Sequence, residues 1–233
     1  MAFGATGAWL YSMSAALTVS NQGVGDLLIV EVINFSNSTV WATGLTGGGA
    51  TWTMAGVKFS GTTNNYAASV FLGTVTSTGA GTVTPTWSGT APGTYSLTGH
   101  EFTSSVGNWA FDQQANLDSA GTLSWPSLTP VVNGELYFGM SGSFSASAGT
   151  TAGYVYNSDA NGDGEAYNLS CPSGTGTFPV WAGTVGSNGM VFGIMILVKE
   201  VALTSPLVDS PVPVNIPVIL AGRAGWRNAG HSR

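Results

Sequence analysis

Hydrophobic residues along the chain recur in short runs that fit β-strands better than helices. Five segments are rich in β-branched and aromatic residues: 26–35 (DLLIVEVINF), 66–75 (YAASVFLGTV), 95–103 (YSLTGHEFT), 135–142 (ELYFGMSG) and 190–201 (MVFGIMILVKEV). That composition is typical of strands. The first and last runs are almost continuously apolar, which predicts central strands covered on both faces.

Clusters of glycine, serine, threonine and asparagine separate these runs, at 43–51, 60–65, 76–82 and 88–94. They predict turns and loops. The 34 glycines show no three-residue period, which excludes collagen and favours many tight turns. We therefore predict an all-β fold, a jelly-roll-like antiparallel β-sandwich, with a β-barrel as the alternative.

The strand pattern stops near Val201, and four of the ten prolines fall within the twelve residues from Pro206. We therefore divide the chain into a sandwich body, residues 1–201, and a proline-rich extended C-terminal arm with a basic end, residues 202–233.

The arm alternates apolar residues with prolines. In an extended chain Val212, Val214, Ile216 and Val218 share one face, and the N–H groups missing at Pro211, Pro213 and Pro217 belong to one edge. Such a strand can pair on one side only, which favours its addition to the exposed sheet edge of a partner. Arg223, Trp226 and Arg227 would extend that contact. A strand folded back on its own body and a disordered polyproline linker are the alternatives.

Charge is sparse and unevenly placed. Charged residues make up 7% of the chain, whose net charge is −6. The body through Glu200 carries −8 and the rest of the chain carries +2, an asymmetry expected of an interaction arm. Three arginines are too few for a typical nucleic-acid footprint, so we predict no nucleic-acid partner. A surface of Ser, Thr, Gly and Asn fits a rigid particle component.

One cysteine, Cys171, excludes an intrachain disulfide and is predicted to be a small buried or half-buried hydrophobic residue. The N-terminus lacks the positive region of a secretory signal. The strongly apolar run 190–198 is far shorter than a membrane-spanning helix. We expect a soluble protein made in a cytoplasm, without membrane insertion.

The segment 159–170 (DANGDGEAYNLS) resembles the start of a calcium-binding loop. Asp159, Asn161 and Asp163 occupy its first, third and fifth positions, and a glycine follows. The twelfth position is Ser170 instead of glutamate, so Glu165 would have to supply the acidic ligand. A solvated hairpin turn between 154–157 and 165–169 is the alternative. No other cofactor is predicted.

Candidate catalytic residues lack supporting features. His100 and Glu101 are adjacent on a predicted strand, so their side chains point to opposite faces. Asp112 and Asp118 would form a glycosidase pair only if their carboxyl groups faced each other across a cleft. Hydrolase and zinc-protease motifs are absent from the sequence. We therefore predict no enzyme, and we assign the aromatic residues to the core in preference to sugar stacking.

The stretch 23–35 (GVGDLLIVEVINF), followed by a glycine-rich turn with tryptophan and by YAASVFLGTV, resembles a strand pattern of virion proteins from actinobacterial tailed phages. The resemblance covers roughly residues 8–200. It implies a minor tail or capsid decoration protein with a jelly-roll domain, oligomeric, bound to other virion proteins and located in the virion after assembly in the bacterial cytoplasm. A module of the virion that binds host-surface glycans is the main alternative, and a glycan-degrading enzyme is a third.

Overall fold

A computed structural model describes residues 3–36, 39–59, 66–120, 124–142, 144–158, 163–185 and 190–202. These residues form fifteen strands and no helix, and every strand pairing among them is antiparallel. They belong to one compact unit, Met1–Leu203. The predicted all-β sandwich is therefore confirmed, whereas the predicted arm beyond Ala202 lies outside the described residues.

The first eight strands follow a jelly-roll-like order. They are β1 (Phe3–Met13), β2 (Leu17–Asn21), β3 (Leu27–Asn34), β4 (Ala42–Gly47), β5 (Ala50–Phe59), β6 (Ala67–Val75), β7 (Gly79–Trp87) and β8 (Tyr95–Ser104). Five of them form a sheet in the order β1-β8-β3-β6-β5, called here the first sheet, and a smaller sheet has the order β2-β7-β4. Consecutive strands alternate between two facing sheets, as in a jelly roll, except that β5 pairs with β6 in the first sheet.

The other seven strands are β9 (Trp109–Ala120), β10 (Glu135–Gly142), β11 (Phe144–Ser147), β12 (Val155–Ser158), β13 (Gly164–Cys171), β14 (Ala182–Val185) and β15 (Met190–Glu200). Five of them form the second sheet, in the order β12-β13-β10-β15-β9, and β11 pairs with β14. Strands β12 and β13 pair as antiparallel neighbours, with Val155 opposite Tyr167 and Ser158 opposite Gly164, which agrees with the hairpin that was the alternative to a calcium loop.

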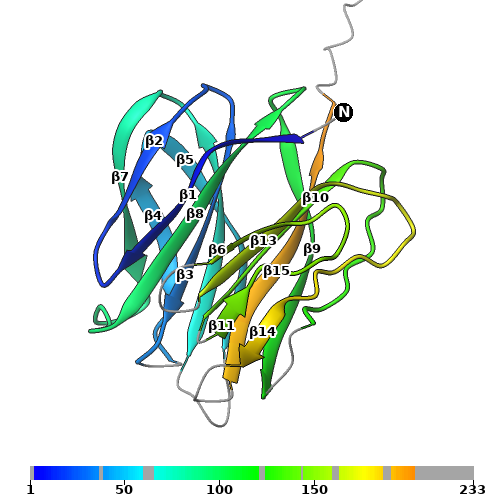
Figure 1. The fold of residues 1–233 in the computed structure, drawn as a ribbon. Helices are drawn as coiled ribbons and strands as arrows, with labels where there is room; N and C mark the ends of the chain where they lie inside the picture. The colour runs from blue at the N-terminus through cyan, green and yellow to red at the C-terminus, as the bar shows by residue number, and fades with distance from the viewer. Residues whose placement is uncertain are drawn as a thin grey trace, which may run out of the picture. The chain divides into compact units, whose positions relative to one another are not determined.

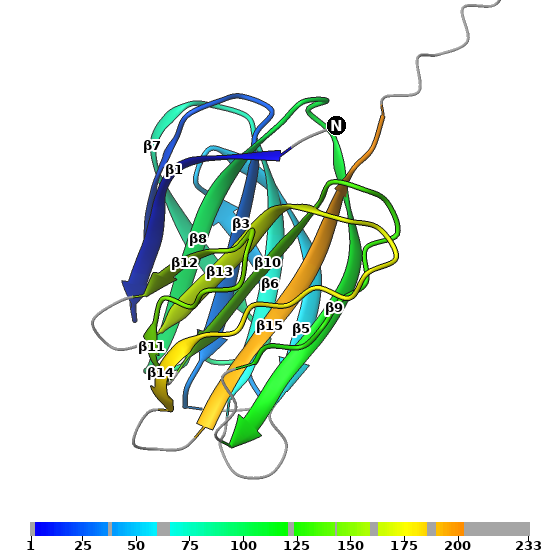
Figure 2. The ribbon, with the colours of Figure 1, turned by 45° about the vertical axis from the view of Figure 1, so that its right-hand side comes forward.

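The sheets are stacked in layers, and the first and second sheets face each other at the centre (Figures 1 and 2). We call the cluster between them the central core. The β2-β7-β4 sheet covers the other face of the first sheet, where Leu17, Phe71 and Val83 are among the buried residues. Trp125, Trp181 and their neighbours cover the outer face of the second sheet.

Strand β3 shows how the sequence specifies this layering. Leu27, Ile29 and Ile33 point into the central core. Leu28, Val30 and Val32 point to the β2-β7-β4 sheet. All eight residues of β3 are buried, so the prediction of a doubly covered strand from its continuous apolar run is confirmed.

Two segments predicted as loops contribute to strands instead. Segment 43–51 holds most of β4 and the start of β5, joined at Gly47–Gly49, whose φ angles are all positive. Segment 76–82 includes the first residues of β7. In β7 small and polar residues alternate with the buried Val83 and Pro85. Because one side of this strand faces solvent, its composition resembles that of a loop.

Candidate functional site

Of the four predicted calcium ligands, two lie outside the described residues and two are buried. Asp159 and Asn161 lie outside the described residues. Asp163 and Glu165, at the start of β13, are both buried. Glu165 accepts a hydrogen bond from Asn157 Nδ2 at 2.9 Å and lies 2.8 Å from His100 Nδ1. Among the described residues, no three acidic, histidine or cysteine side chains are grouped closely enough to hold a metal ion.

His100 joins the two large sheets. It comes from β8 in the first sheet, and its partner Glu165 comes from β13 in the second. The imidazole stacks on Phe102, with centroids 4.9 Å apart, and meets the edge of Tyr167 at 5.0 Å. Burial raises the pKa of Glu165, and the hydrogen bonds from His100 and Asn157 partly offset that rise.

Glu31 is a second carboxyl group in the central core. It lies on β3 opposite Thr98 of β8, and both residues are 0% exposed. Burial raises its pKa well above the ordinary value, although the N–H of Ile194, which donates to Oε1 at 3.2 Å, acts in the opposite direction. Burial therefore favours the protonated form of Glu31, which avoids the cost of a charge in an apolar core.

Glu101 points to the other face of β8, which confirms that it cannot pair with His100. Its carboxylate accepts hydrogen bonds from the N–H of Gln22, at 2.9 and 3.0 Å, and from the N–H of Gly23, at 3.2 Å. Burial, a hydrogen bond to Glu101 and repulsion by Glu101 raise the pKa of Asp26 to about 6. The two carboxyl groups therefore hold the loop between β2 and β3.

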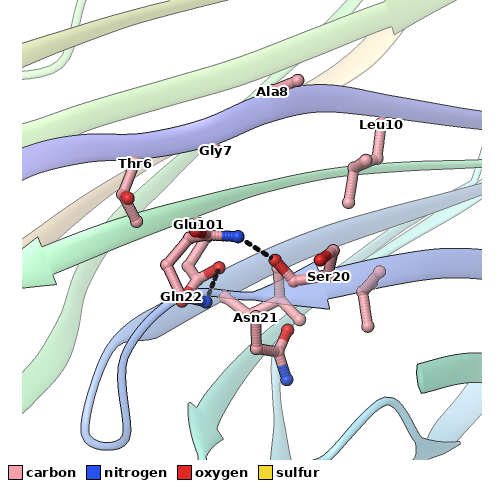
Figure 3. Close-up of a pocket in the computed structure, with 10 residues that line it drawn as sticks. Thr6, Gly7, Ala8, Leu10, Ser20, Asn21, Gln22 and Glu101 are labelled. Atoms are coloured by element: carbon pink, nitrogen blue, oxygen red, sulfur yellow. Dashed lines mark hydrogen bonds between the residues drawn. The ribbon is translucent and has the colours of Figure 1, made fainter. Parts of the chain in front are cut away.

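A pocket of about 120 Å³ lies beside Glu101 (Figure 3). Thr6 and Leu10 of β1 form one wall, and Ser20 and Asn21 of β2 form another. Small-molecule sites usually enclose about 300–1,000 Å³. This pocket therefore has room for a few water molecules or a small polar group.

Other carboxyl groups also stabilise loops. Glu135 accepts hydrogen bonds from the N–H groups of Val131 and Val132 at 2.7 and 2.8 Å. Glu200 accepts one from the N–H of Ser105 at 2.7 Å. Because unpaired backbone N–H groups are costly when they are withdrawn from water, these acids have a structural role.

The hypothetical glycosidase pair is not assembled by the described side chains. Asp112 Oδ1 lies 2.6 Å from Lys199 Nζ in an ion pair. Both aspartates belong to β9, but the side chain of Asp118 is outside what the structure describes. Asp112 is thus engaged by a cation on the neighbouring strand, β15.

The tryptophans of the described residues are all buried or half-buried. Trp125 and Trp181 pack on each other with centroids 5.3 Å apart. Trp52 and Trp87 pack against the core of the jelly roll. The assignment to the core is therefore confirmed for Trp52, Trp87, Trp125 and Trp181.

Cys171 is fully buried, as predicted. Burial raises the pKa of its thiol to about 11. The protonated thiol is a poor nucleophile, so this cysteine packs and does not react.

A second hollow, of about 230 Å³, lies between the edge strands β5 and β9. Its lining includes Trp109 and Leu72, and Met54 and Phe111 at its rim are each 38% exposed. Within the described residues β5 pairs only with β6, and β9 pairs only with β15. This side of the sandwich therefore presents two strand edges and a hollow of mixed polar and apolar lining to solvent.

The predicted partner-binding residues all lie outside the described residues; they are 211–214, 216–218, Arg223, Trp226 and Arg227. The described chain ends just after β15, where the N–H of Val201 donates to the carbonyl of Asn108.

No helix in the described part of the chain is long and apolar enough to cross a membrane. Comparison of the chain with protein-family models, curated proteins and solved structures found no match.

Proposed function

We propose that the protein is a structural subunit of a tailed-phage particle, a minor tail or capsid decoration protein without catalytic activity. Its jelly-roll body would be displayed on the particle, and its C-terminal arm would attach it to neighbouring subunits. The proposal agrees with the virion-protein resemblance of segment 23–35.

The observation that supports this proposal is that the described glutamate side chains have structural roles in the fold. Glu101, Glu135 and Glu200 bind backbone N–H groups of loops. Glu31 and Glu165 are buried in the central core. Hydrolases of the glycosidase type need two acids facing a cleft, and these carboxyl groups are engaged in the fold instead. A body built in this way is suited to rigidity.

Sugar binding is less well supported than decoration. A glycan site would place exposed tryptophan or tyrosine rings in a concave groove, yet no tryptophan or tyrosine of the described residues is exposed, and the exposed ring at the β5–β9 hollow is that of Phe111. We therefore retain protein–protein attachment as the main role. From the sequence alone, an extended arm would keep its amide donors along one edge, which would suit it to strand addition on a neighbouring subunit.

The test is incorporation into particles. The full chain and a chain that ends at Ser205 would be produced during phage assembly, and particles would be purified on a density gradient. We expect the full chain to sediment with particles and the shortened chain to stay in the soluble fraction with an unchanged melting temperature. Absence of the full chain from purified particles would refute the proposal.

A matched pair of variants tests which edge of the arm pairs with a neighbouring subunit. Val214→Pro removes an N–H from the edge that the proline pattern leaves intact, whereas Asn215→Pro removes one from the edge already interrupted by prolines. Val214→Pro should reduce incorporation strongly, and Asn215→Pro should reduce it little. Equal effects would show that strand pairing does not attach the arm.

A further inference from the structure

The two halves of the described chain have the same strand order. The first sheet runs β1-β8-β3-β6-β5, and the second, taken from its β9 edge, runs β9-β15-β10-β13-β12. Replacing each strand of one sheet by its counterpart in chain order reproduces the other sheet. The counterparts are β1 and β9, β3 and β10, β5 and β12, β6 and β13, and β8 and β15.

The outer layers correspond in the same way. The small sheet of the first half has the order β2-β7-β4. In the second half, isolated bridges join Ser124 to Val180 and Leu128 to Thr177, and β14 pairs with β11. Segment 124–128 thus takes the place of β2, segment 177–185 that of β7, and β11 that of β4.

The starts of β3 and β10 are equivalent in atomic detail. Gly25 and Gly134 precede the strands with φ angles of 92° and 85°. Each donates its N–H, at 2.9 Å, to the carbonyl of the last residue of the neighbouring strand, which is Val75 of β6 or Cys171 of β13. The sequences that follow are Asp-Leu-Leu and Glu-Leu-Tyr.

A second stretch shows the relation in the sequence itself. Residues 81–87 read GTVTPTW, and residues 176–181 read GTFPVW, one residue shorter. The first stretch belongs to β7, and the second belongs to its counterpart beside Ser124 and Leu128. Position in the fold and residue type therefore agree.

Both halves contribute the same face to the central core. The first sheet supplies Phe102 and the second supplies Phe138 and Tyr167, with ring centroids 5.9 and 5.3 Å from that of Phe102. The His100–Glu165 contact crosses the same interface. The only chain segment linking β8 to β9 is 105–108.

We propose that the chain is a tandem duplication of one jelly-roll unit, residues 3–104 and 109–202. The central face of each five-stranded sheet is then a protein–protein interface whose partner is the other unit. An apolar interface of this kind associates without a covalent link, as in an obligate dimer. The inference is independent of the proposed virion role.

The experiment cuts the linker in the folded full chain. A protease recognition sequence would be inserted between Val106 and Gly107, where Gly107 is exposed. The uncut insertion variant, with the melting temperature of the original protein, is the reference. After cleavage, we expect both fragments to elute together from a sizing column at the volume of the uncut protein. Fragments that separate in native buffer at micromolar concentration would overturn the proposal.

Two phenylalanine variants locate the interface. Phe138→Ala removes a ring from the central core, whereas Phe178→Ala removes a ring that is 39% exposed. In the cut protein, Phe138→Ala should lower the urea concentration at which the fragments separate, and Phe178→Ala should leave it unchanged. If both or neither shifted that concentration, the assigned interface would be wrong. Circular dichroism of the uncut forms verifies that each variant is folded.

Discussion

Glu31 provides a direct test of the chemistry assigned to the central core. Its side chain is 0% exposed, and one carboxyl oxygen, Oε2, has no hydrogen-bond partner in the structure. Burial raises its pKa in the folded state. In the unfolded chain Glu31 ionises near pH 4.5, whereas in the folded state it keeps its proton to a higher pH. Rising pH therefore favours the unfolded state, and this stabilising contribution is lost as the pH climbs from that value to the folded pKa.

The magnitude follows from proton linkage. Each pH unit in that window removes at most about 1.4 kcal/mol of the free energy of unfolding for one retained proton. Glu31→Gln cannot ionise, so this loss disappears in the variant. The unpaired amide hydrogens of glutamine add a cost of about 1–3 kcal/mol at every pH. The variant should therefore gain stability relative to the original protein as the pH rises from 5 to 8.

The assay is urea unfolding at pH 5, 6.5 and 8, monitored by tryptophan fluorescence. Thr98→Val is the matched control, because Thr98 lies opposite Glu31 in the sheet, is buried and carries no titratable group. Its effect on the free energy of unfolding should be the same at each pH. If Glu31→Gln also gave the same difference at pH 5 and pH 8, the reasoning would be refuted.

Three further predictions follow. Phe102→Ala should cost about 3–5 kcal/mol in urea unfolding, because it leaves a cavity between the large sheets. Gly25→Ala should cost about 1–2 kcal/mol through its φ of 92° alone, since no neighbouring atom would contact the new Cβ; unfolding midpoints measure this. NMR titration should give Asp26 a midpoint near pH 6, and Glu101→Gln should lower that midpoint by removing the charge that repels it. An unchanged Asp26 midpoint would contradict the pairing.

The strands that are buried on both faces could be predicted from the sequence. The runs at 26–35 and 190–201 correspond to β3 and β15, because both faces of these strands require apolar residues. The edge strands β1 and β9 escaped prediction. In β9 the polar residues Asp112, Gln113 and Gln114 interrupt the alternation, since an edge strand tolerates contact with water.

The duplication could not be read from the strand pattern. Counterpart strands occupy equivalent positions in their sheets. Such a position requires that one face of the strand be apolar, but it does not require a particular residue there. Conserved detail survives where the backbone demands it, as at Gly25 and Gly134 with their positive φ angles. The residue pairs between sheets were equally hidden, because His100 and Glu165 are 65 positions apart in the chain.

The candidate site was predicted only in part. Asp163 and Glu165 attracted attention as oxygen ligands because the spacing of the segment resembles a metal loop. The prediction missed that Glu165 points inward to His100 and Asn157. The alternation of β13 was the available signal, because Glu165 and the core residue Tyr167 lie two positions apart and so share a face.

The place of β15 in its sheet has a mechanical consequence. The strand is paired along its length with β9 on one side and with β10 on the other, and its C-terminal end leads to the arm. A pull applied through the arm and along the strand would load both ladders in shear, so that many hydrogen bonds resist together instead of opening one at a time. A protein held by this end would withstand tension that would peel away a strand at the rim of a sheet.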